Sequence, residues 1–416
     1  MDQFVIVGPS RLEGEIAVSG AKNAALPCIA AALLTDEPVR LENLPNVADI
    51  RTLARVLQHV GASVERDGDA AVIEARSIGS ADAPYELVKT MRASVLVLGP
   101  LLARAGSVRV SLPGGCAIGV RPINLHLAAF EKLGAQVRLE HGYVEARASR
   151  LTGADVSFDT VTVTGTENVL LAATLARGTT RLLNAAREPE VVDLARLLAA
   201  MGARISGAGT DTIVVEGVER LHGARHAVIP DRIEAGTYAL AAAATRGDVR
   251  ITRCSPAHLG ALTTRLNAAG VRVDAAGDVL HVRANGGLSS HDVATAPYPG
   301  FPTDLQAQWM AFAAGLDGVA TITETIFENR FQHVAELVRM GARVRLEGRW
   351  AVVEGPARLT GARVMASDLR ASAALVIAGL AAEGETTIER VYHLDRGYQR
   401  MEEKLGAVGA QVRRVS

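Results

Sequence analysis

The hydrophobic pattern of this chain repeats six times. In each copy, an amphipathic segment with apolar residues at helical spacing ends at a glycine, and a strand-like segment follows. These glycines lie about 70 residues apart, at Gly61, Gly134, Gly202, Gly270, Gly341 and Gly409. Glycine suits the end of a helix, because the backbone turns left-handed there at no steric cost. We therefore expect six copies of one α/β unit.

A second kind of segment opens each copy. It is rich in small apolar residues and has no polar face, as in residues 23–34 (NAALPCIAAALL) and 371–382 (ASAALVIAGLAA). Such a segment predicts a helix that is buried on all sides. A turn, a strand, the amphipathic helix and two more strands follow. The pattern predicts an α/β fold of two inverse α/β, prism-like domains, each with three units in which strands and outer helices surround buried helices.

The first residues of the chain belong with its end. Residues 4–20 repeat the pattern of residues 350–368, with GPSRLEG in the first matching GPARLTG in the second, whereas the sixth unit stops abruptly at VRRVS. We therefore expect the N-terminal strand to complete the sixth unit. The predicted domains are residues 22–229 and residues 1–21 together with 230–416.

Composition and charge exclude several classes of function. The 416 residues are 49% hydrophobic, and the formal net charge of −1 lacks the basic surplus of nucleic-acid-binding proteins. The longest apolar runs are too short to span a bilayer, and the N-terminal residues lack a signal-peptide pattern. The three cysteines, Cys28, Cys116 and Cys254, fit neither a disulfide framework nor a CxxC zinc motif. We expect a cytoplasmic protein with no metal site and no membrane insertion.

One glycine-rich stretch, SLPGGCAIGVRP at residues 111–122, has the features of a reactive loop. A strand-like run ends at Pro113, and Cys116 stands five positions before Arg121. A nearby cation or helix N-terminus favours the thiolate, which is the reactive form of cysteine. A small, buried and inert cysteine in a turn is the competing interpretation.

Polar side chains gather at equivalent places in the units, at the starts of the buried helices or at the turns before the outer helices. They are Lys22, Asn23, Arg92, Arg121, Glu167, Asn168, Arg187, Glu188, Asp231, Asp304, Arg330, Asp368, Arg370 and Arg396. Helix N-termini there supply unpaired N–H groups and partial positive charge, which favours a phosphate-bearing ligand. Asp304 is then a candidate general base, and Cys116 a candidate proton donor or acceptor. Singly, these residues are also explained as helix caps and surface ion pairs.

Together, the motifs resemble the UDP-N-acetylglucosamine 1-carboxyvinyltransferase family. They are SGAKNAAL, MRAS, SLPGGCAIGVRP, NAAREPE, PTDLQAQ, TETIFENRF, SDLRAS and YHLDRGY, and they span essentially the whole chain. The resemblance implies two domains with threefold pseudo-symmetry. It also implies transfer of enolpyruvyl from phosphoenolpyruvate to the 3′-hydroxyl of UDP-N-acetylglucosamine in peptidoglycan synthesis, with release of phosphate and no metal or organic cofactor. The epoxide antibiotic fosfomycin would alkylate the loop cysteine.

The resemblance implies catalytic roles for Lys22, Cys116, Asp304 and Arg396, with Arg121 as a substrate-binding residue beside them. Lys22, Arg121 and Arg396 would hold the phosphate of phosphoenolpyruvate. Cys116 would protonate its methylene carbon and help to release product. Asp304 would take the proton of the sugar hydroxyl as the tetrahedral intermediate forms.

The resemblance also implies a set of substrate-binding residues. Arg330 and Arg370 would address the carboxylate of phosphoenolpyruvate. The nucleotide sugar would contact Asn23, Arg92, Arg121, Pro122, Ile123, Asn124, Leu125 and Ile326. Glu188, Asp231 and Asp368 complete the expected set. This chain reads TVTGT at residues 162–166, where many relatives read SVGAT. The resemblance therefore does not assign contacts with the diphosphate of the nucleotide sugar to this segment.

Two alternatives remain at this point. The sister enzyme that acts on shikimate 3-phosphate has the same architecture and donor, but it is not expected to carry the GGCAIG loop. A catalytically silent repeat protein that only binds nucleotide sugars would not need Lys22, Cys116, Asp304 and Arg396 together.

Overall fold

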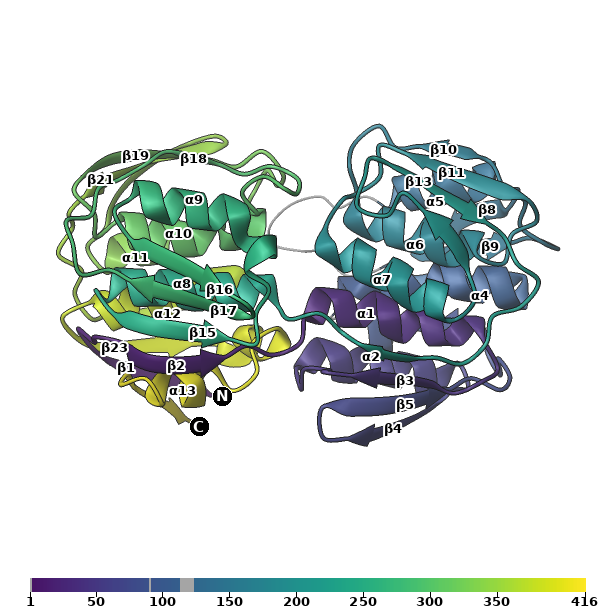
Figure 1. Cartoon of the computed structure of the whole chain (residues 1–416), viewed down its shortest axis with the longest axis horizontal. Helices are drawn as coiled ribbons and strands as arrows, with labels where there is room; N and C mark the ends of the chain where they lie inside the picture. The colour runs from purple at the N-terminus through teal and green to yellow at the C-terminus, as the bar shows by residue number, and fades with distance from the viewer. Residues whose placement is uncertain (1, 90, 113–122) are drawn as a thin grey trace. The chain divides into compact units, whose positions relative to one another are not determined.

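The computed structural model describes residues 2–89, 91–112 and 123–416 (Figure 1). Over these residues the chain forms two compact units. The first unit consists of residues 20–112 and 123–229, and the second of residues 2–19 and 230–416. The chain passes between the units at residues 19–20 and 229–230.

The described part of the first unit contains three four-stranded sheets, with strand orders β14-β3-β5-β4, β6-β7-β9-β8 and β10-β11-β13-β12. Their strands are β3 (Val39–Glu42), β4 (Ser63–Asp67), β5 (Ala70–Glu74), β6 (Asp82–Ala83), β7 (Ser107–Ser111), β8 (Gln136–Glu140), β9 (Tyr143–Arg147), β10 (Asp155–Ser157), β11 (Thr179–Leu183), β12 (Arg204–Ser206), β13 (Thr212–Glu216) and β14 (Arg225–Ala227).

The second unit has three such sheets in its described residues, with orders β16-β17-β15-β2, β18-β19-β21-β20 and β22-β23-β1-β24. Their strands are β1 (Gln3–Gly8), β2 (Glu13–Ala17), β15 (Asp248–Thr252), β16 (Arg272–Ala276), β17 (Val279–Arg283), β18 (Val293–Ala294), β19 (Gly318–Thr323), β20 (Arg343–Glu347), β21 (Trp350–Gly355), β22 (Arg363–Met365), β23 (Gly384–Glu389) and β24 (Gln411–Val415).

All six sheets share one topology. One edge strand runs parallel to its neighbour, and the other two pairings are antiparallel, as in the parallel pair β10 and β11 and the antiparallel pairs β11–β13 and β12–β13. The sixth sheet follows the same rule only because β1 lies between β23 and β24, where Phe4 pairs with Ile388 on one side and Arg414 on the other. The expectation that the N-terminal strand completes the sixth unit is confirmed.

Each unit combines buried inner helices with amphipathic outer helices. In the first unit the helices are α1 (Lys22–Ala31), α2 (Ala48–His59), α3 (Tyr85–Val88), α4 (Leu98–Ala105), α5 (Asn124–Lys132), α6 (Val163–Ala173) and α7 (Pro189–Ala200), with 3-10 turns η1 (Ala32–Leu34) and η2 (Arg92–Val97). In the second unit they are α8 (Arg232–Ala244), α9 (Gly260–Ala268), α10 (Gln306–Ala313), α11 (Val334–Arg339), α12 (Leu369–Ala381) and α13 (Met401–Gly406), with η3 (Pro256–Leu259), η4 (Thr303–Leu305) and η5 (Val391–Arg396).

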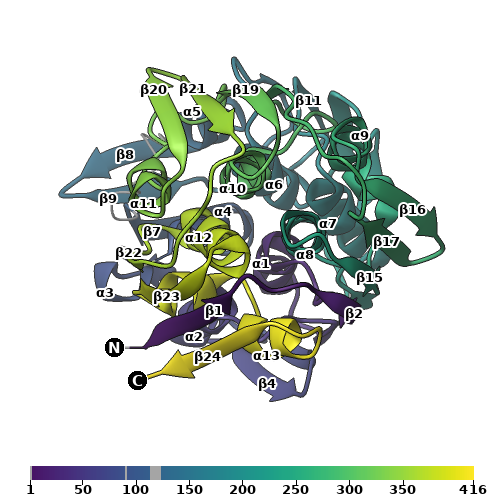
Figure 2. The ribbon, with the colours of Figure 1, turned by 90° about the vertical axis from the view of Figure 1, so that its left-hand side faces the viewer.

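Three helices of the second unit, α8, α10 and α12, pack against one another, and Figure 2 shows them side by side with the strands of that unit around them. Nearly every residue of these helices is buried, as the absence of a polar face predicts. Close packing depends on small residues: a Cβ added at Gly236 in α8 would lie 2.5 Å from a methyl carbon of Leu305. The 3-10 turn η4 is thereby held against the buried helices.

The helix-ending glycines adopt the conformation that the repeats predict. Gly61, Gly134, Gly202, Gly270, Gly341 and Gly409 all have φ between 90° and 107°. A residue with a Cβ adopts these angles only at a cost, so glycine at each repeat end has a backbone reason. Among the described helices, none is both long and apolar enough to cross a membrane.

Candidate functional site

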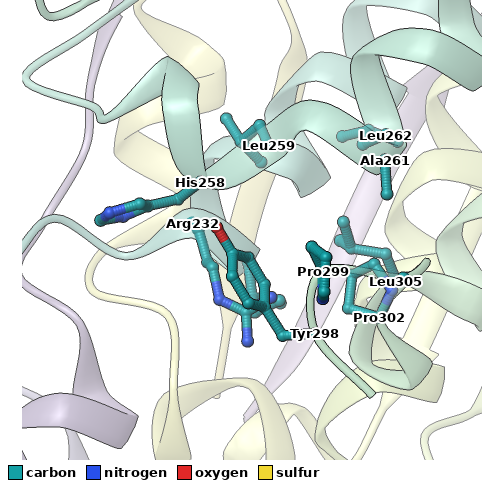
Figure 3. A pocket seen from close by; sticks show the side chains of 11 residues that line it. Arg232, His258, Leu259, Ala261, Leu262, Tyr298, Pro299, Pro302 and Leu305 are labelled. Carbon is teal, nitrogen blue, oxygen red and sulfur yellow. The ribbon is translucent and has the colours of Figure 1, made fainter. Parts of the chain in front are cut away.

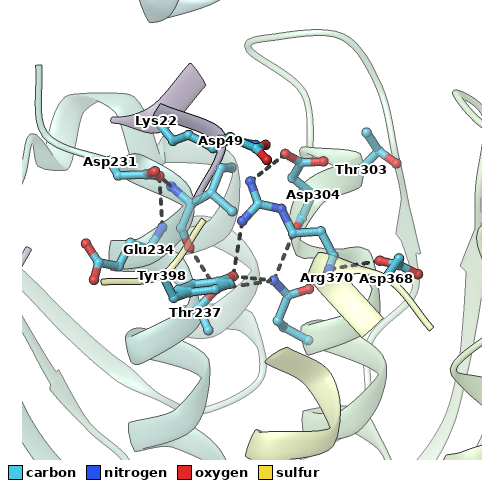
Figure 4. Close-up of polar contacts among 12 residues, drawn as sticks. Lys22, Asp49, Asp231, Glu234, Thr237, Thr303, Asp304, Asp368, Arg370 and Tyr398 are labelled. Atoms are coloured by element: carbon cyan, nitrogen blue, oxygen red, sulfur yellow. Dashed lines mark hydrogen bonds and ion pairs between the residues drawn. The ribbon is translucent and has the colours of Figure 1, made fainter. Parts of the chain in front are cut away.

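A cluster of charges in the second unit centres on Asp304 in η4. Its Oδ1 accepts a hydrogen bond from Nη2 of Arg330 at 2.7 Å, and its Oδ2 accepts one from Nη2 of Arg370 at 2.8 Å. The two arginine side chains are buried, whereas a quarter of the Asp304 side chain is exposed. Figure 4 shows Asp304 and Arg370 facing one another. Three residues that are far apart in the sequence therefore form one charged group.

The electrostatics of this cluster favour the ionised forms of Asp304 and Arg370. Burial alone would raise the pKa of Asp304, but the guanidiniums of Arg370 and Arg330 more than offset burial and hold that pKa well below its usual range. Burial would lower the pKa of Arg370, and the charge of Asp304 outweighs it, so the pKa of Arg370 is raised. Asp304 is thus an ionised carboxylate whose basicity is suppressed by two guanidiniums.

A helix cap places Arg370. Asp368 is the N-cap residue of α12, and its Oδ1 accepts hydrogen bonds from the backbone N–H groups of Arg370 and Ala371 at 2.8 and 3.0 Å. The cap starts the helix at a defined residue, so Arg370 stands in the first turn. Its Nη1 donates to the hydroxyl of Tyr398 at 3.2 Å. Asp368 was expected both at a helix start and among the substrate-binding residues. The structure shows it as a helix cap.

A buried glutamate places Arg330. Glu324 accepts hydrogen bonds from the hydroxyls of Thr295 and Thr303 and from the backbone N–H of Ile326, at 2.8 to 2.9 Å. The same Thr303 hydroxyl accepts from Nη1 of Arg330 at 3.0 Å. Nε of Arg330 is buried and has no hydrogen-bond partner among the described residues. Because a buried donor without a partner is costly, this group favours an added acceptor such as a ligand anion.

Tyr398 connects the cluster to the buried helices. Its hydroxyl lies 2.9 Å from Oγ1 of Thr237 in α8 and 3.3 Å from Nε2 of Gln308 in α10, in addition to its bond with Arg370. The contacts converge on one hydroxyl, as Figure 4 shows. The sequence interpretation did not single out Tyr398, Thr237 or Glu324. The signal for Glu324 was present, since it lies within the TETIFENRF motif.

Asp231 caps α8 in the same unit. Its Oδ1 accepts hydrogen bonds from the backbone N–H groups of Ile233 and Glu234 at 2.8 and 3.0 Å. The side chain of Glu234 is fully buried and forms an ion pair with Lys404 at 2.7 Å. Asp231 therefore has a structural role in starting the helix, whatever it contributes to a ligand.

Replacing Asp231 with alanine is expected to lower the free energy of unfolding by about 1 kcal/mol, within the range of 0.5–2 kcal/mol that N-cap removal costs. The reason is that two N–H groups at the start of α8 lose their acceptor. Asp231→Asn keeps a capping oxygen and should stay close to the parent protein. Denaturant unfolding of the two variants measures the difference, and equal losses for alanine and asparagine would show that the charge matters rather than the cap.

Two further residues expected in the site, Arg396 and Ile326, are close in sequence to Tyr398 and Arg330, respectively. Arg396 ends η5 and is half-buried. Ile326 lies in the loop that Glu324 organises.

Burial lowers the pKa of His333 to about 4, although the charge of Asp368 opposes the shift. His333 is therefore neutral at neutral pH and adds no charge to the cluster.

In the first unit, Lys22 begins α1 and is buried. Its Nζ lies 3.2 Å from Oδ2 of Asp49, in the first turn of α2. Asn23 follows in the first turn of α1 and is half-buried, and Glu188 is the buried N-cap residue of α7. Lys22 and Glu188 are thus held at helix starts, as the repeat pattern predicts.

Other expected residues of the first unit are described in part. Arg92 begins η2, Ile123 precedes α5, and Asn124 and Leu125 form its first turn. Thr162, in the segment that departs from SVGAT, caps α6 by accepting a hydrogen bond from the N–H of Gly165 at 3.2 Å. Cys116, Arg121 and Pro122 lie outside the described residues.

A small pocket also lies in the second unit, with Pro302 and Leu305 in its lining. The guanidinium of Arg232 lies over the ring of Tyr298, 5.6 Å from its centre, and His258 is also in the lining, as Figure 3 shows. The side chains of Asp304, Arg330 and Arg370 do not line it. The charged cluster, rather than this pocket, is therefore the candidate site of this unit.

Known proteins resemble this chain over its whole length. The model of the EPSP synthase (3-phosphoshikimate 1-carboxyvinyltransferase) family matches residues 6–405. A UDP-N-acetylglucosamine 1-carboxyvinyltransferase of Koribacter versatilis is 57% identical, and the match covers 100% of this chain and 97% of the relative. One of Solibacter usitatus is 58% identical, with 100% of both chains covered. This chain belongs to the EPSP synthase family.

Solved structures agree with this assignment. The crystal structure of the enolpyruvyl transferase NikO from Streptomyces tendae superposes with a TM-score of 0.91 at 30% identity, covering 100% of this chain and 99% of the other. EPSP synthase from Acinetobacter baumannii superposes with a TM-score of 0.76 at 19% identity, covering all of both chains, which is a likeness of fold alone. The predicted fold class, with repeated α/β units around buried helices, is confirmed.

Proposed function

We propose that this protein transfers the enolpyruvyl group of phosphoenolpyruvate to the 3′-hydroxyl of UDP-N-acetylglucosamine and releases phosphate, as a cytoplasmic step of peptidoglycan synthesis. The observation that carries the proposal is the 57–58% identity, over the full chain, to relatives named UDP-N-acetylglucosamine 1-carboxyvinyltransferase. Its partners are these two small molecules, and the chemistry requires neither a metal nor an organic cofactor.

The reaction needs a base at the sugar hydroxyl and an acid at the methylene carbon. As the hydroxyl oxygen bonds to C2 of phosphoenolpyruvate, its proton passes to Asp304, and Cys116 donates a proton to C3. Loss of phosphate from C2 and of a proton from C3 then restores the double bond. Arg330 and Arg370 are the groups we assign to the carboxylate of phosphoenolpyruvate.

The charged cluster supports a role for the substrate in activating Asp304. Arg330 and Arg370 each donate one hydrogen bond to Asp304 through Nη2. A bound carboxylate would share these donors and partly neutralise both guanidiniums. The pKa of Asp304 would then rise from its lowered value, so that Asp304 becomes a better base when phosphoenolpyruvate is present.

The other assignments follow the family resemblance and the helix starts. Lys22, Arg121 and Arg396 would hold the phosphate. The nucleotide sugar would be bound by Asn23, Arg92, Arg121, Pro122, Ile123, Asn124, Leu125 and Ile326. Glu188, Asp231 and Asp368 would support this set from the N-terminal ends of α7, α8 and α12.

Phosphate release on mixing both substrates tests the proposal and separates it from the alternatives. We expect release that requires both phosphoenolpyruvate and UDP-N-acetylglucosamine, with mass spectrometry showing the enolpyruvyl ether. Release with shikimate 3-phosphate in place of the nucleotide sugar would identify the sister activity. Binding of the nucleotide sugar with no phosphate release would identify a non-catalytic binding protein.

The three cysteines should differ sharply in reactivity. Cys28 is fully buried and Cys254 is 3% exposed, and burial raises the pKa of both thiols. Neither supplies thiolate at neutral pH, so an alkylating reagent should modify Cys116 first, and the family resemblance makes fosfomycin a selective one. Peptide mapping after brief alkylation measures the order, and labelling of Cys28 or Cys254 ahead of Cys116 would contradict it.

A further inference from the structure

Three side chains with metal-binding atoms meet inside the first unit. Cys28 lies in α1, Asp193 in α7 and His226 in β14, and one potential ligand atom of each lies within 4.8 Å of the other two. Oδ1 of Asp193 is 3.0 Å from Nε2 of His226, and its Oδ2 is 4.0 Å from Sγ of Cys28. Cys28 and Asp193 are buried, and only 12% of the His226 side chain is exposed.

The order of these contacts does not suit a nucleophilic cysteine. A histidine that activates a thiol must lie between the thiol and the carboxylate. Here Asp193 lies between Cys28 and His226, and Cys28 has no exposed surface from which to reach a substrate. Thiolate, imidazole and carboxylate are, in contrast, the three ligand types that proteins use for zinc.

A buried glutamate lies in a helix that neighbours the cluster. Glu167 lies in α6, which packs against both α1 and α7, and burial, together with the charges of Glu190 and Glu188, raises the pKa of its carboxyl group well above the usual range. The side chain is buried, and its Oε1 has no hydrogen-bond partner among the described residues. A buried oxygen without a partner is costly, and a nearby bound cation would favour the ionised form of this carboxyl group.

We propose that Cys28, Asp193 and His226 bind a zinc-type divalent cation as a structural site, and Glu167 in the adjacent helix is a candidate for the fourth ligand. Zinc bond lengths place the ligand atoms of a tetrahedral site about 3.3–3.7 Å apart. The ligand atoms of the three residues lie within 4.8 Å of one another, so each would have to move by about 1 Å or less to reach these separations. On binding, the thiol proton leaves to solvent, and His226 coordinates through Nε2 with its proton on Nδ1.

The expected effect is on stability. Such an ion would join α1, α7 and β14, which are far apart in the sequence. The two helices among these elements begin at residues that we assign to the substrate site: Lys22 is the first residue of α1, and Glu188 caps α7. The ion would stabilise the positions of these helix starts without taking part in the reaction, so this inference does not depend on the proposed function.

Titration with Co²⁺, a spectroscopic substitute for zinc, tests the site in the full chain after treatment with a chelator. A Cys116→Ser background removes the thiol of the loop from the measurement. We expect one equivalent of Co²⁺ to give a thiolate-to-cobalt charge-transfer band that zinc abolishes. Cys28→Ser should eliminate the band, and His226→Gln should weaken binding by at least about tenfold. Cys254→Ser, which changes the buried cysteine of the second unit, should leave the spectrum unchanged.

The melting temperature is the second measurement. Zinc should raise it in the background protein, because a ligand that binds only the folded state stabilises that state. The increase should disappear in Cys28→Ser. Asp193→Asn, which keeps the shape of the side chain, serves the same purpose if Cys28→Ser does not fold. A missing charge-transfer band, or a band that persists in Cys28→Ser, would overturn the proposal and leave the three residues as a hydrogen-bonded network.

Discussion

Replacing Asp304 with alanine is expected to lower turnover by about 10²–10⁴-fold, the usual contribution of general acid–base catalysis. Affinity for the nucleotide sugar should change far less. The expectation rests on the position of Asp304 between the guanidiniums of Arg330 and Arg370, where it stays ionised and is able to accept a proton once the substrate draws positive charge away. Single-turnover kinetics with both substrates bound measures the chemical step directly.

The matched variant for this experiment is Asp304→Asn. Asparagine keeps the size of the side chain and an oxygen that accepts a hydrogen bond from one guanidinium, but it is not a base at neutral pH. Both variants should therefore lose turnover to a similar extent. If Asp304→Asn retained the rate, or if substrate binding collapsed while bound substrate still reacted, Asp304 would be a binding residue and the base would be another group.

Replacing Arg370 with alanine is expected to lower the free energy of unfolding by about 3 kcal/mol, the lower end of the range for breaking a buried ion pair. Asp304 and the hydroxyl of Tyr398 both lose a partner, although Arg330 still compensates the carboxylate. For a unit of this size, about 3 kcal/mol corresponds to a melting temperature lower by about 6–12 °C. Calorimetry measures both quantities.

The control for Arg370→Ala is Arg363→Ala. Arg363 pairs with Glu389 at the surface of the same unit, and two thirds of its side chain is exposed. An exposed pair contributes about 1 kcal/mol or less, so this variant should melt close to the parent protein. Similar losses for both variants would contradict the importance of the buried cluster.

The penalty for Arg370→Ala should also depend on pH. The pKa of Asp304 is lowered in the folded protein, so its stabilising contribution is fully present above its pKa in the unfolded chain, which is about 3.9. That contribution is lost as the pH falls through the lower, folded-state pKa. The difference between the parent protein and Arg370→Ala should therefore be constant near neutral pH and should shrink in acid. A difference that is the same in acid would mean that Asp304 does not account for the penalty.

The repeated architecture could be predicted from the sequence because its signals are local. A glycine after an amphipathic segment, as at Gly134 or Gly341, specifies a left-handed backbone turn wherever it occurs. A run without a polar face, as in α10 or α12, specifies a helix without an exposed side. The position of β1 followed from the match between GPSRLEG and GPARLTG together with the abrupt end of the sixth unit.

The candidate site could be predicted only in part. The sequence, through its resemblance to a family, assigned Asp304, Arg330 and Arg370 to one site, but it did not indicate that both guanidiniums hold the carboxylate ionised. That result depends on burial and on distances of 2.7 and 2.8 Å, which no spacing along the chain encodes. The same holds for Tyr398, whose hydroxyl joins α8, α10 and Arg370.

The sequence alone therefore determined the repeat, the six turns and the family, because each of these depends on short stretches of chain. Tertiary structure decided which groups meet. Cys28 and Asp193 are separated by 165 positions, and Asp193 and His226 by 33, yet packing of α1, α7 and β14 brings their side chains together. Burial then sets their charge and reactivity, because the cost of an ionised or unpaired group depends on its surroundings in space.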